Sequence, residues 1–196
     1  MPGLLPPPRT RRVLVLDNLD SFTYSLVQQF QILGCAVDVV RSALPDDAAD
    51  YDLIVLSPGP GRPEEHPVLM QTVSRPPTSL FGVCLGMQAI ALAAGARVAG
   101  APKAVHGRAS NILHQQGAFF AGLPSPFRAT RYHSLAVYEL PDSLHALAHA
   151  RDGTIMALQH STLPISGVQF HPESVRTQYG LRLIENVLSQ TVSAER

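Results

Sequence analysis

Gly82-Val83-Cys84-Leu85-Gly86-Met87-Gln88 is the stretch of sequence around which the predicted fold is organised. The apolar run Leu80 to Val83 leads into it, and the helix-forming run Met87 to Ala94 leads out of it. A cysteine between a strand and a helix, with glycines at positions −2 and +2, is typical of a nucleophile elbow. Glycine permits the sharp turn and the close approach of neighbouring segments. The helix N-terminus favours a thiolate here; a buried cysteine that only packs in the core is the alternative.

Strands and helices alternate on the amino-terminal side of this stretch. The predicted strands are Arg12 to Leu16, Cys35 to Val40, Leu53 to Leu56 and Leu80 to Val83. The predicted helices are Pro67 to Ser74 and a segment capped by Asp20-Ser21 that runs to about Leu33, with Phe22, Leu26, Phe30 and Leu33 on one stripe. This alternation predicts an α/β fold with an open, mostly parallel sheet flanked by helices. Asp17-Asn18 would end the first strand at a ligand crevice.

The pattern changes after Gly95, where short β-like runs are separated by turn residues. The runs are Arg97 to Ala99, Ala109 to Leu113, Phe127 to Thr130, Ala136 to Glu139, Ala146 to His149, Ile155 to Leu158 and Ile165 to Phe170. They predict antiparallel additions to the sheet, with a hairpin turn at residues 151–154. A last helix, Gln178 to Leu188, would place Leu181, Ile184 and Leu188 on one apolar face. We expect a disordered leader at residues 1–11 and one domain over residues 12–196.

The composition argues against several functional classes. The chain has 196 residues, 45% of them hydrophobic and 15% charged, and its formal net charge is zero. Such a balance disfavours nucleic acid or an anionic membrane surface as the main partner, and no apolar run approaches bilayer length. The proline-rich start does not resemble a signal peptide, so we expect a cytoplasmic protein with reduced thiols. One disulfide between Cys35 and Cys84 is the alternative, and Cys35, at the start of a strand, is expected to pack rather than react.

A rigid loop, Ser57-Pro58-Gly59-Pro60-Gly61, follows the third predicted strand. Its two prolines lack backbone N–H groups, so Gly59 and Gly61 supply the free donors. The loop is either a plain strand-to-helix turn or a cradle for an anion or oxyanion. It does not match the phosphate-binding Walker pattern, because no Gly-Lys-Ser/Thr follows it.

A nucleophilic cysteine needs a base, and the base needs a group that orients it. Among eight histidines, His171 has the fitting setting, because an apolar strand ends there in His171-Pro172-Glu173. Residues two apart in extended backbone point to the same side, so Glu173 can hold the imidazole. The alternative is that His171 is a polar residue satisfied by its surroundings.

The remaining histidines are weaker candidates for this role. We expect His66, His114, His145, His149 and His160 to lie at the surface, and His106 stays ambiguous. His133 is expected to serve local structure or ligand contact rather than as the base. No group of histidines and cysteines has the spacing of a zinc site, so we expect no metal.

Five motifs in order resemble the class I (triad) glutamine amidotransferases. They are Leu16-Asp17-Asn18-Leu19-Asp20-Ser21-Phe22-Thr23-Tyr24, Ser57-Pro58-Gly59-Pro60-Gly61, Gly82-Val83-Cys84-Leu85-Gly86-Met87-Gln88, Arg131-Tyr132-His133-Ser134-Leu135 and Gln169-Phe170-His171-Pro172-Glu173-Ser174. The first motif is similar to the chorismate-pathway branch, which contains the small subunit of anthranilate synthase and the glutaminase subunit of aminodeoxychorismate synthase. The resemblance covers the chain from about Arg12 onward and implies a flavodoxin-like fold.

The resemblance implies hydrolysis of L-glutamine, with ammonia handed to a large chorismate-binding synthase subunit. It makes Cys84 the nucleophile, His171 the general base and acid, and Glu173 the group that orients His171. The oxyanion hole would be the N–H groups of Gly59 and Leu85. The glutamine contacts would be Gly59, Pro60, Gly61, Gln88, Ser134 and Leu135. No cofactor is expected in this chain, and Mg²⁺ only on the synthase partner.

Two features depart from the chorismate branch. Met87 stands where that branch usually has histidine; methionine at this place is similar to GMP synthetases, and activity is expected to survive it. The segment at residues 42–52 is too short for a full helix with its loops. Anthranilate synthase is the first choice of pathway and aminodeoxychorismate synthase the second. Two readings from different classes stay open: a non-catalytic regulatory or binding subunit with the same fold, and a stand-alone cysteine amide hydrolase.

Overall fold

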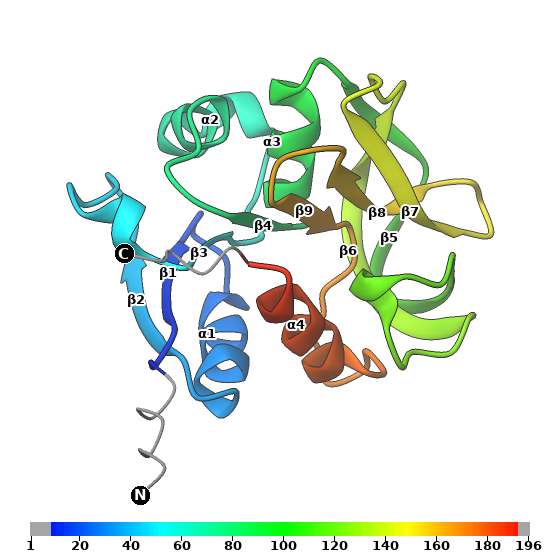
Figure 1. Cartoon of the computed structure of the whole chain (residues 1–196). Helices are drawn as coiled ribbons and strands as arrows, with labels where there is room; N and C mark the ends of the chain where they lie inside the picture. The colour runs from blue at the N-terminus through cyan, green and yellow to red at the C-terminus, as the bar shows by residue number, and fades with distance from the viewer. Residues whose placement is uncertain (1–8, 192–196) are drawn as a thin grey trace, which may run out of the picture.

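One mixed sheet organises the structure, a computed structural model that describes residues 9–191 (Figure 1). Its strands are β1 (Arg12–Leu16), β2 (Ala36–Val40), β3 (Leu53–Leu56), β4 (Leu80–Val83), β5 (Arg97–His114), β6 (Phe127–Tyr138), β7 (Leu144–Ala150), β8 (Ile155–His160) and β9 (Ile165–Val168). Their order in the sheet is β2-β1-β3-β4-β9-β8-β7-β5-β6. All pairs from β2 to β9 are parallel, and all pairs from β9 to β6 are antiparallel. The predicted α/β class, with a parallel half and antiparallel additions, is therefore confirmed. The run Ile165 to Phe170 was predicted as an antiparallel addition, but it forms β9 and joins the parallel half through β4.

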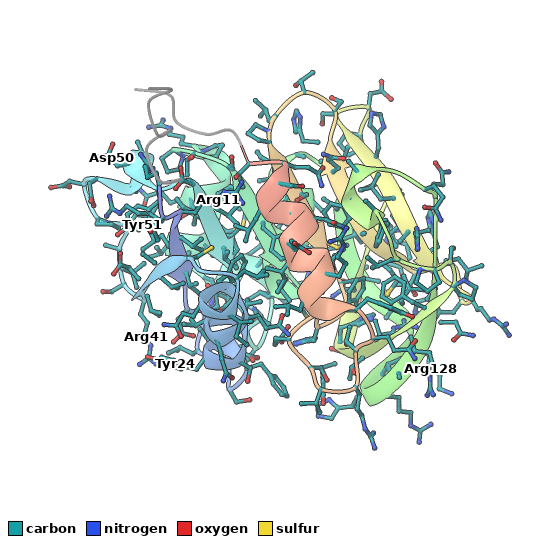
Figure 2. All side chains as sticks on the ribbon, turned by 60° about the horizontal axis from the view of Figure 1, so that its bottom comes forward. Arg11, Tyr24, Arg41, Asp50, Tyr51 and Arg128 are labelled. Atoms are coloured by element: carbon teal, nitrogen blue, oxygen red, sulfur yellow. The ribbon has the colours of Figure 1, made fainter. Side chains whose placement is uncertain are left out.

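Helices cover both faces of the parallel half. They are α1 (Thr23–Ile32), α2 (Pro67–Ser74), α3 (Leu85–Ala93) and α4 (Gly180–Ser189), with short 3₁₀ turns η1 (Ala48–Asp50), η2 (Pro63–Glu65) and η3 (Ala118–Phe120). In Figure 1, α1 and α4 lie on one face of the sheet, and α2 and α3 lie on the other. Figure 2 shows Tyr24 and Arg41 together near one edge of the molecule and Arg128 toward the opposite edge.

The central strands are buried on both faces, as their unbroken apolar runs predict. Val13 and Val15 pack into the core layer under α1 and α4, whereas Leu14 and Leu16 pack into the layer under α2 and α3. The alternation follows from the two-residue repeat of a strand, which points successive side chains to opposite faces. The apolar side chains of the helices on each face complete the corresponding core layer. These two layers fix the strand ends that carry the site.

The predicted short strands after Gly95 are longer in the structure. The runs at Arg97 to Ala99 and Ala109 to Leu113 are parts of the single strand β5, and those at Phe127 to Thr130 and Ala136 to Glu139 are parts of β6. The prediction of separate strands was wrong, because the turn residues between the runs sit in irregularities of a continuous ladder. The register of β5 on β6 shifts between Gly100 and Val105 and again between His106 and Arg108. Such bulges bend a strand without ending it.

Two helix ends also differ from the prediction. Helix α1 starts at Thr23 with Phe22 as its N-cap, and the carboxylate of Asp20 accepts from the Phe22 N–H at 2.8 Å. Helix α4 starts at Gly180, and its buried stripe is Leu183, Ile184, Val187 and Leu188. Leu181 lies at the edge of that stripe and is 38% exposed, so its predicted place on the buried face was wrong.

The link between β2 and β3 contains η1 and no longer helix, as its length predicts. Asp52, at the end of this link, accepts from the Arg12 N–H at 2.8 Å and pairs with Arg9 at 3.0 Å. Residues 1–8 of the predicted leader lie outside the described residues, and the division into a leader and one domain stays a prediction. No helix within residues 9–191 is long and apolar enough to cross a membrane.

Candidate active site

The segments that follow β1, β3, β4 and β9 meet at the carboxyl edge of the parallel strands. Leu16 is in register with Leu56, and Val83 with Val168, so these strands end at nearly the same level. Such an edge is where open α/β sheets bind ligands. The predicted cysteine elbow, proline-glycine loop and His-Pro-Glu strand end are all brought to this one place.

Cys84 stands on a strained turn between β4 and α3. Its φ is +53° and its ψ is −101°, a conformation that L-residues rarely adopt. Its N–H donates to the Val168 carbonyl at 2.8 Å, which ties the turn to the neighbouring strand. A Cβ at Gly82 would collide with the backbone of Gly86, and a Cβ at Gly86 would collide with the Leu56 carbonyl. The two glycines are therefore required by close packing around the elbow.

His171 and Glu173 form a buried pair shortly after the end of β9. The Nδ1 atom of His171 lies 2.6 Å from Oε1 of Glu173, and the two side chains are 2% and 0% exposed. A carboxylate only accepts, so Nδ1 carries the proton of this bond. Nε2 of His171 and Oε2 of Glu173 are buried and have no hydrogen-bond partner within residues 9–191. The second ring nitrogen is thus left for a group other than Glu173.

The surroundings of His171 favour its protonated form. Burial lowers the pKa of His171, but interactions with Cys84 and Glu173 outweigh burial and raise this pKa to about 10. Phe22 and Tyr132 pack around the ring, with centroids 5.6 and 5.1 Å from that of His171. An imidazolium held by a carboxylate, beside Cys84 and two aromatic rings, can deliver a proton to a leaving group.

The proline-glycine loop is anchored by Asn18, the second residue after the end of β1. Asn18 receives no direct role from sequence reasoning, yet its N–H donates to Ser57 Oγ at 2.8 Å and its side-chain amide donates to the Ser57 carbonyl at 2.9 Å. A Cβ at Gly59 would lie 2.8 Å from Asn18 Cβ and 2.6 Å from Leu85 Cδ2. Only glycine lets this loop approach the elbow so closely.

Cys84 lines an open pocket of about 280 Å³. Its lining contains the predicted residues Gly59, Pro60, Gly61, Cys84, Gln88, Ser134 and Leu135. Leu85 does not line it, and its backbone N–H is the first of α3, one of those that no residue of the helix can accept. The remaining lining residues are Ala104, Val105, His106, Tyr132 and His133. Two pocket walls thus come from β5 and β6, in the antiparallel half.

Sequence reasoning missed several residues of this site. Ala104, Val105 and His106 reach the pocket from the bulged part of β5, and no local pattern marks them. Gln169 lies within the last predicted motif, and its side chain donates to the sulfur of Cys84 at 3.5 Å. A polar residue between apolar Val168 and Phe170, at the end of a buried strand, was the signal that could have found it.

Two further histidines and the second cysteine are buried. His133 is buried, accepts at Nε2 from Arg131 Nε at 2.9 Å and bonds the Leu135 carbonyl through Nδ1 at 2.7 Å. His114 is buried and stacks on Phe120 with centroids 4.2 Å apart, so its predicted surface position was wrong. His114 ends strand β5, and η3 covers it through Phe120. The turn residues that follow His114 in the sequence give no sign of this cover. Cys35 and Cys84 are both free and buried.

The fold and this site together define an α/β enzyme of the nucleophile-elbow type, with a cysteine at the turn. Comparison with known proteins places it further. Residues 14–191 match the family model of class I glutamine amidotransferases, so the chain belongs to that family. The chain is 46% identical over 189 residues to anthranilate synthase component 2 of Mycobacterium tuberculosis, covering 91% of this chain and 82% of that one.

Other relatives are longer or more distant. The chain is 45% identical over 190 residues to aminodeoxychorismate synthase of Streptomyces pristinaespiralis, covering 91% of this chain but only 26% of that one. Among solved structures, a GMP synthase component from Thermoplasma acidophilum superposes with a TM-score of 0.85 at 27% identity, covering 93% of this chain and 94% of that one. The predicted family and fold are confirmed.

Proposed function

We propose that this chain is the glutaminase component of a chorismate-using synthase. It hydrolyses L-glutamine to glutamate and ammonia, and a large synthase partner consumes the ammonia. The observation that carries the proposal is the meeting of Cys84, the buried His171–Glu173 pair and a pocket of about 280 Å³ at one edge of the sheet. Relatives named anthranilate synthase component 2 and aminodeoxychorismate synthase support the pathway.

The first half of the reaction forms a glutamyl thioester. The Cys84 thiolate attacks the carboxamide carbon of glutamine, the C–O π electrons move to oxygen, and a tetrahedral oxyanion results. The N–H groups of Gly59 and Leu85 would donate to this oxyanion. One such donor lowers the activation barrier by about 3 kcal/mol. When the intermediate collapses, the C–N bond breaks, and the departing nitrogen takes the proton of His171 to leave as ammonia.

The second half releases glutamate. His171, now neutral, removes a proton from water as the water oxygen attacks the thioester carbon. The second tetrahedral intermediate collapses with cleavage of the C–S bond, which restores the Cys84 thiolate and the His171 imidazolium. Glu173 stays ionised throughout and holds the ring by its 2.6 Å contact with Nδ1. No cofactor takes part in these steps, and Mg²⁺ would belong to the synthase partner.

The amino-acid end of glutamine would lie toward the wall formed by Gln88, Ser134 and Leu135, with Gly59 to Gly61 opposite. Gln88 is 3% exposed and reaches the Leu135 carbonyl at 3.4 Å. A polar, backbone-rich wall of this kind suits a substrate that ends in an ammonium and a carboxylate. Anthranilate synthase is the first choice of complex and aminodeoxychorismate synthase the second.

Glutamate release with and without each candidate synthase subunit tests the proposal. We expect release that rises when the correct large subunit is added, and anthranilate or aminodeoxychorismate as the final product. A glutamine-like electrophile such as diazo-oxonorleucine should label Cys84, and Cys84→Ser should abolish both labelling and release. Cys35→Ser is the matched control, because the chain has two cysteines and Cys35 lies away from the pocket.

Each competing function predicts a different result. A non-catalytic subunit would release no glutamate with any partner. A stand-alone amide hydrolase would be protected from labelling by another amide and not by glutamine. Labelling that persists in Cys84→Ser would overturn the assignment of the nucleophile.

A further inference from the structure

The side-chain amide of Gln169 joins Cys84 to Gln88, which belongs to the pocket wall proposed to bind the amino-acid end of glutamine. It follows β9 directly and is fully buried, and its backbone N–H donates to the Met156 carbonyl at 2.9 Å. Its Nε2 donates to Sγ of Cys84 at 3.5 Å, and its Oε1 accepts from Gln88 Nε2 at 3.1 Å. One planar amide therefore bridges the sulfur and Gln88.

The direction of these hydrogen bonds is fixed by a backbone carbonyl. The Leu135 oxygen can only accept, so the Gln88 amide must turn its Nε2 toward it, at 3.4 Å. The same Nε2 then faces Gln169, which must present Oε1 to it. Nε2 of Gln169 is thereby directed at the sulfur. The reversed orientation would set two donors against each other between the glutamines.

The far end of this chain of bonds is equally determined. Arg131 Nε donates to His133 Nε2, so His133 must donate through Nδ1 to the Leu135 oxygen. Arg131 itself is held by Asp152 at 2.9 Å. An arginine that never loses its proton thus sets the direction of the bonds from Arg131 through His133 to the Leu135 carbonyl, which accepts from both His133 and Gln88.

We propose that Gln169 is a positioning residue for Cys84: its amide N–H holds the sulfur as a thiolate aimed into the pocket and couples it to Gln88. The inference deepens the proposed function and rests on Cys84 being the nucleophile. A hydrogen bond to a charged acceptor is stronger than one to a neutral acceptor. The bond therefore favours the thiolate before attack, weakens in the thioester, and forms again when the C–S bond breaks.

Gln169→Leu removes the donor and replaces a buried amide by an apolar group of similar size. We expect alkylation of Cys84 by iodoacetamide at pH 7, without glutamine or partner, to slow by about tenfold. The rates of variant and wild type should converge at high pH, where a thiolate forms without help. Gln169→Glu should slow alkylation further, since a carboxylate would face the sulfur.

Steady-state kinetics separate this role from substrate binding. With the synthase partner present, Gln169→Leu should lower kcat for glutamine by about tenfold and change KM by less than threefold. Gln88→Leu should instead raise KM and slow alkylation by iodoacetamide less than Gln169→Leu does, because Gln169 keeps its donor and loses only the bond that orients it.

Gln159→Leu is the matched control. Gln159 also bonds another glutamine, Gln190, at 3.4 Å, but lies outside the pocket, so alkylation and kcat should be unchanged. All variants are made in a Cys35→Ser background and checked by near-ultraviolet circular dichroism. A folded Gln169→Leu with the wild-type pH profile of alkylation overturns the positioning role, whatever its kcat. Full glutamine hydrolysis in Cys84→Ser overturns the proposed function instead.

Discussion

The carboxylate of Glu173 bonds Nδ1 of His171 and leaves Nε2 free for the proposed proton transfer. Glu173→Gln keeps the size of the side chain, but an amide can donate to Nδ1 and so reverse the imidazole tautomer. We expect kcat for glutamine hydrolysis to fall by roughly 10³-fold or more, with KM changed little. Steady-state kinetics with the synthase partner measure the effect. Glu185→Gln, at an exposed carboxylate paired with Arg182, is the control; equal activity of the two variants would contradict the role of Glu173.

Met87 shows that a residue within a site motif can belong to the core. It is fully buried in the layer under α2 and α3, and its Cβ lies 2.9 Å from where a Cβ at Gly167 would be. It does not line the pocket. Met87→Ala should lower the free energy of unfolding by about 2–5 kcal/mol and leave KM for glutamine within twofold.

Met87→Leu separates core packing from contact with substrate. A volume-conserving change should cost less than about 1.5 kcal/mol of stability, measured by urea unfolding. A large rise in KM with unchanged stability would show that Met87 contacts the substrate.

At the scale of elements, the elbow is set by how closely α3 approaches β3. Gly86→Ala would press a methyl group into the Leu56 carbonyl, a backbone atom that cannot move without shifting the strand. We expect a loss of about 1–3 kcal/mol or more in the free energy of unfolding. Gly117→Ala is the control, because its Cβ meets open space and its φ is extended, so its change should stay within about 0.5 kcal/mol. Equal stability of the two variants would disprove the close approach.

Elements with a local signal were predictable. The runs Leu53 to Leu56 and Leu80 to Val83 coincide with β3 and β4, because an unbroken apolar run between turn residues has few other uses in an α/β chain. The sequence also predicts that the elbow, the proline-glycine loop and the His-Pro-Glu strand end lie close together, since parallel strands end at one edge of a sheet. The part of the site in β5 could not be predicted. Val105 and His106 reach the pocket through bulges in β5, and their partners in β6, His133 and Tyr132, are distant in the sequence.

At the scale of the whole molecule, the two halves of the sheet divide the site between them. The parallel half carries Cys84 on its elbow, whereas the antiparallel half supplies the wall at Ser134 and Leu135. Arg131 in β6 pairs with Asp152 in the turn between β7 and β8, and so joins three strands behind that wall. His133 lies inside this joint and must be neutral to accept from Arg131.

Burial and the neighbouring Arg131 lower the pKa of His133 to about 4. A neutral histidine whose pKa is lowered by folding stabilises the fold fully at pH values above its pKa in the unfolded chain, about 6.5. This stabilisation is lost as the pH falls toward 4. The raised pKa of His171 acts in the opposite window, because its contribution is lost as pH rises from about 6.5 to 10. Between pH 6.5 and 4.5, protonation of His133 should therefore lower the free energy of unfolding by about 2 kcal/mol.

Urea unfolding at a series of pH values, with His133→Gln beside wild type, isolates this contribution. The variant cannot gain a proton at position 133, so its unfolding free energy should change by about 2 kcal/mol less than that of wild type between pH 6.5 and 4.5. His149→Gln, at an exposed histidine of β7, should keep the wild-type slope. Parallel curves for wild type and His133→Gln would mean that the joint tolerates a charged imidazole, and would remove the reason for the fixed hydrogen-bond direction from Arg131 to Leu135. If the slope of unfolding free energy against pH disappears only in His133→Gln, then the acid stability of the whole sheet depends on a residue in the wall of the pocket.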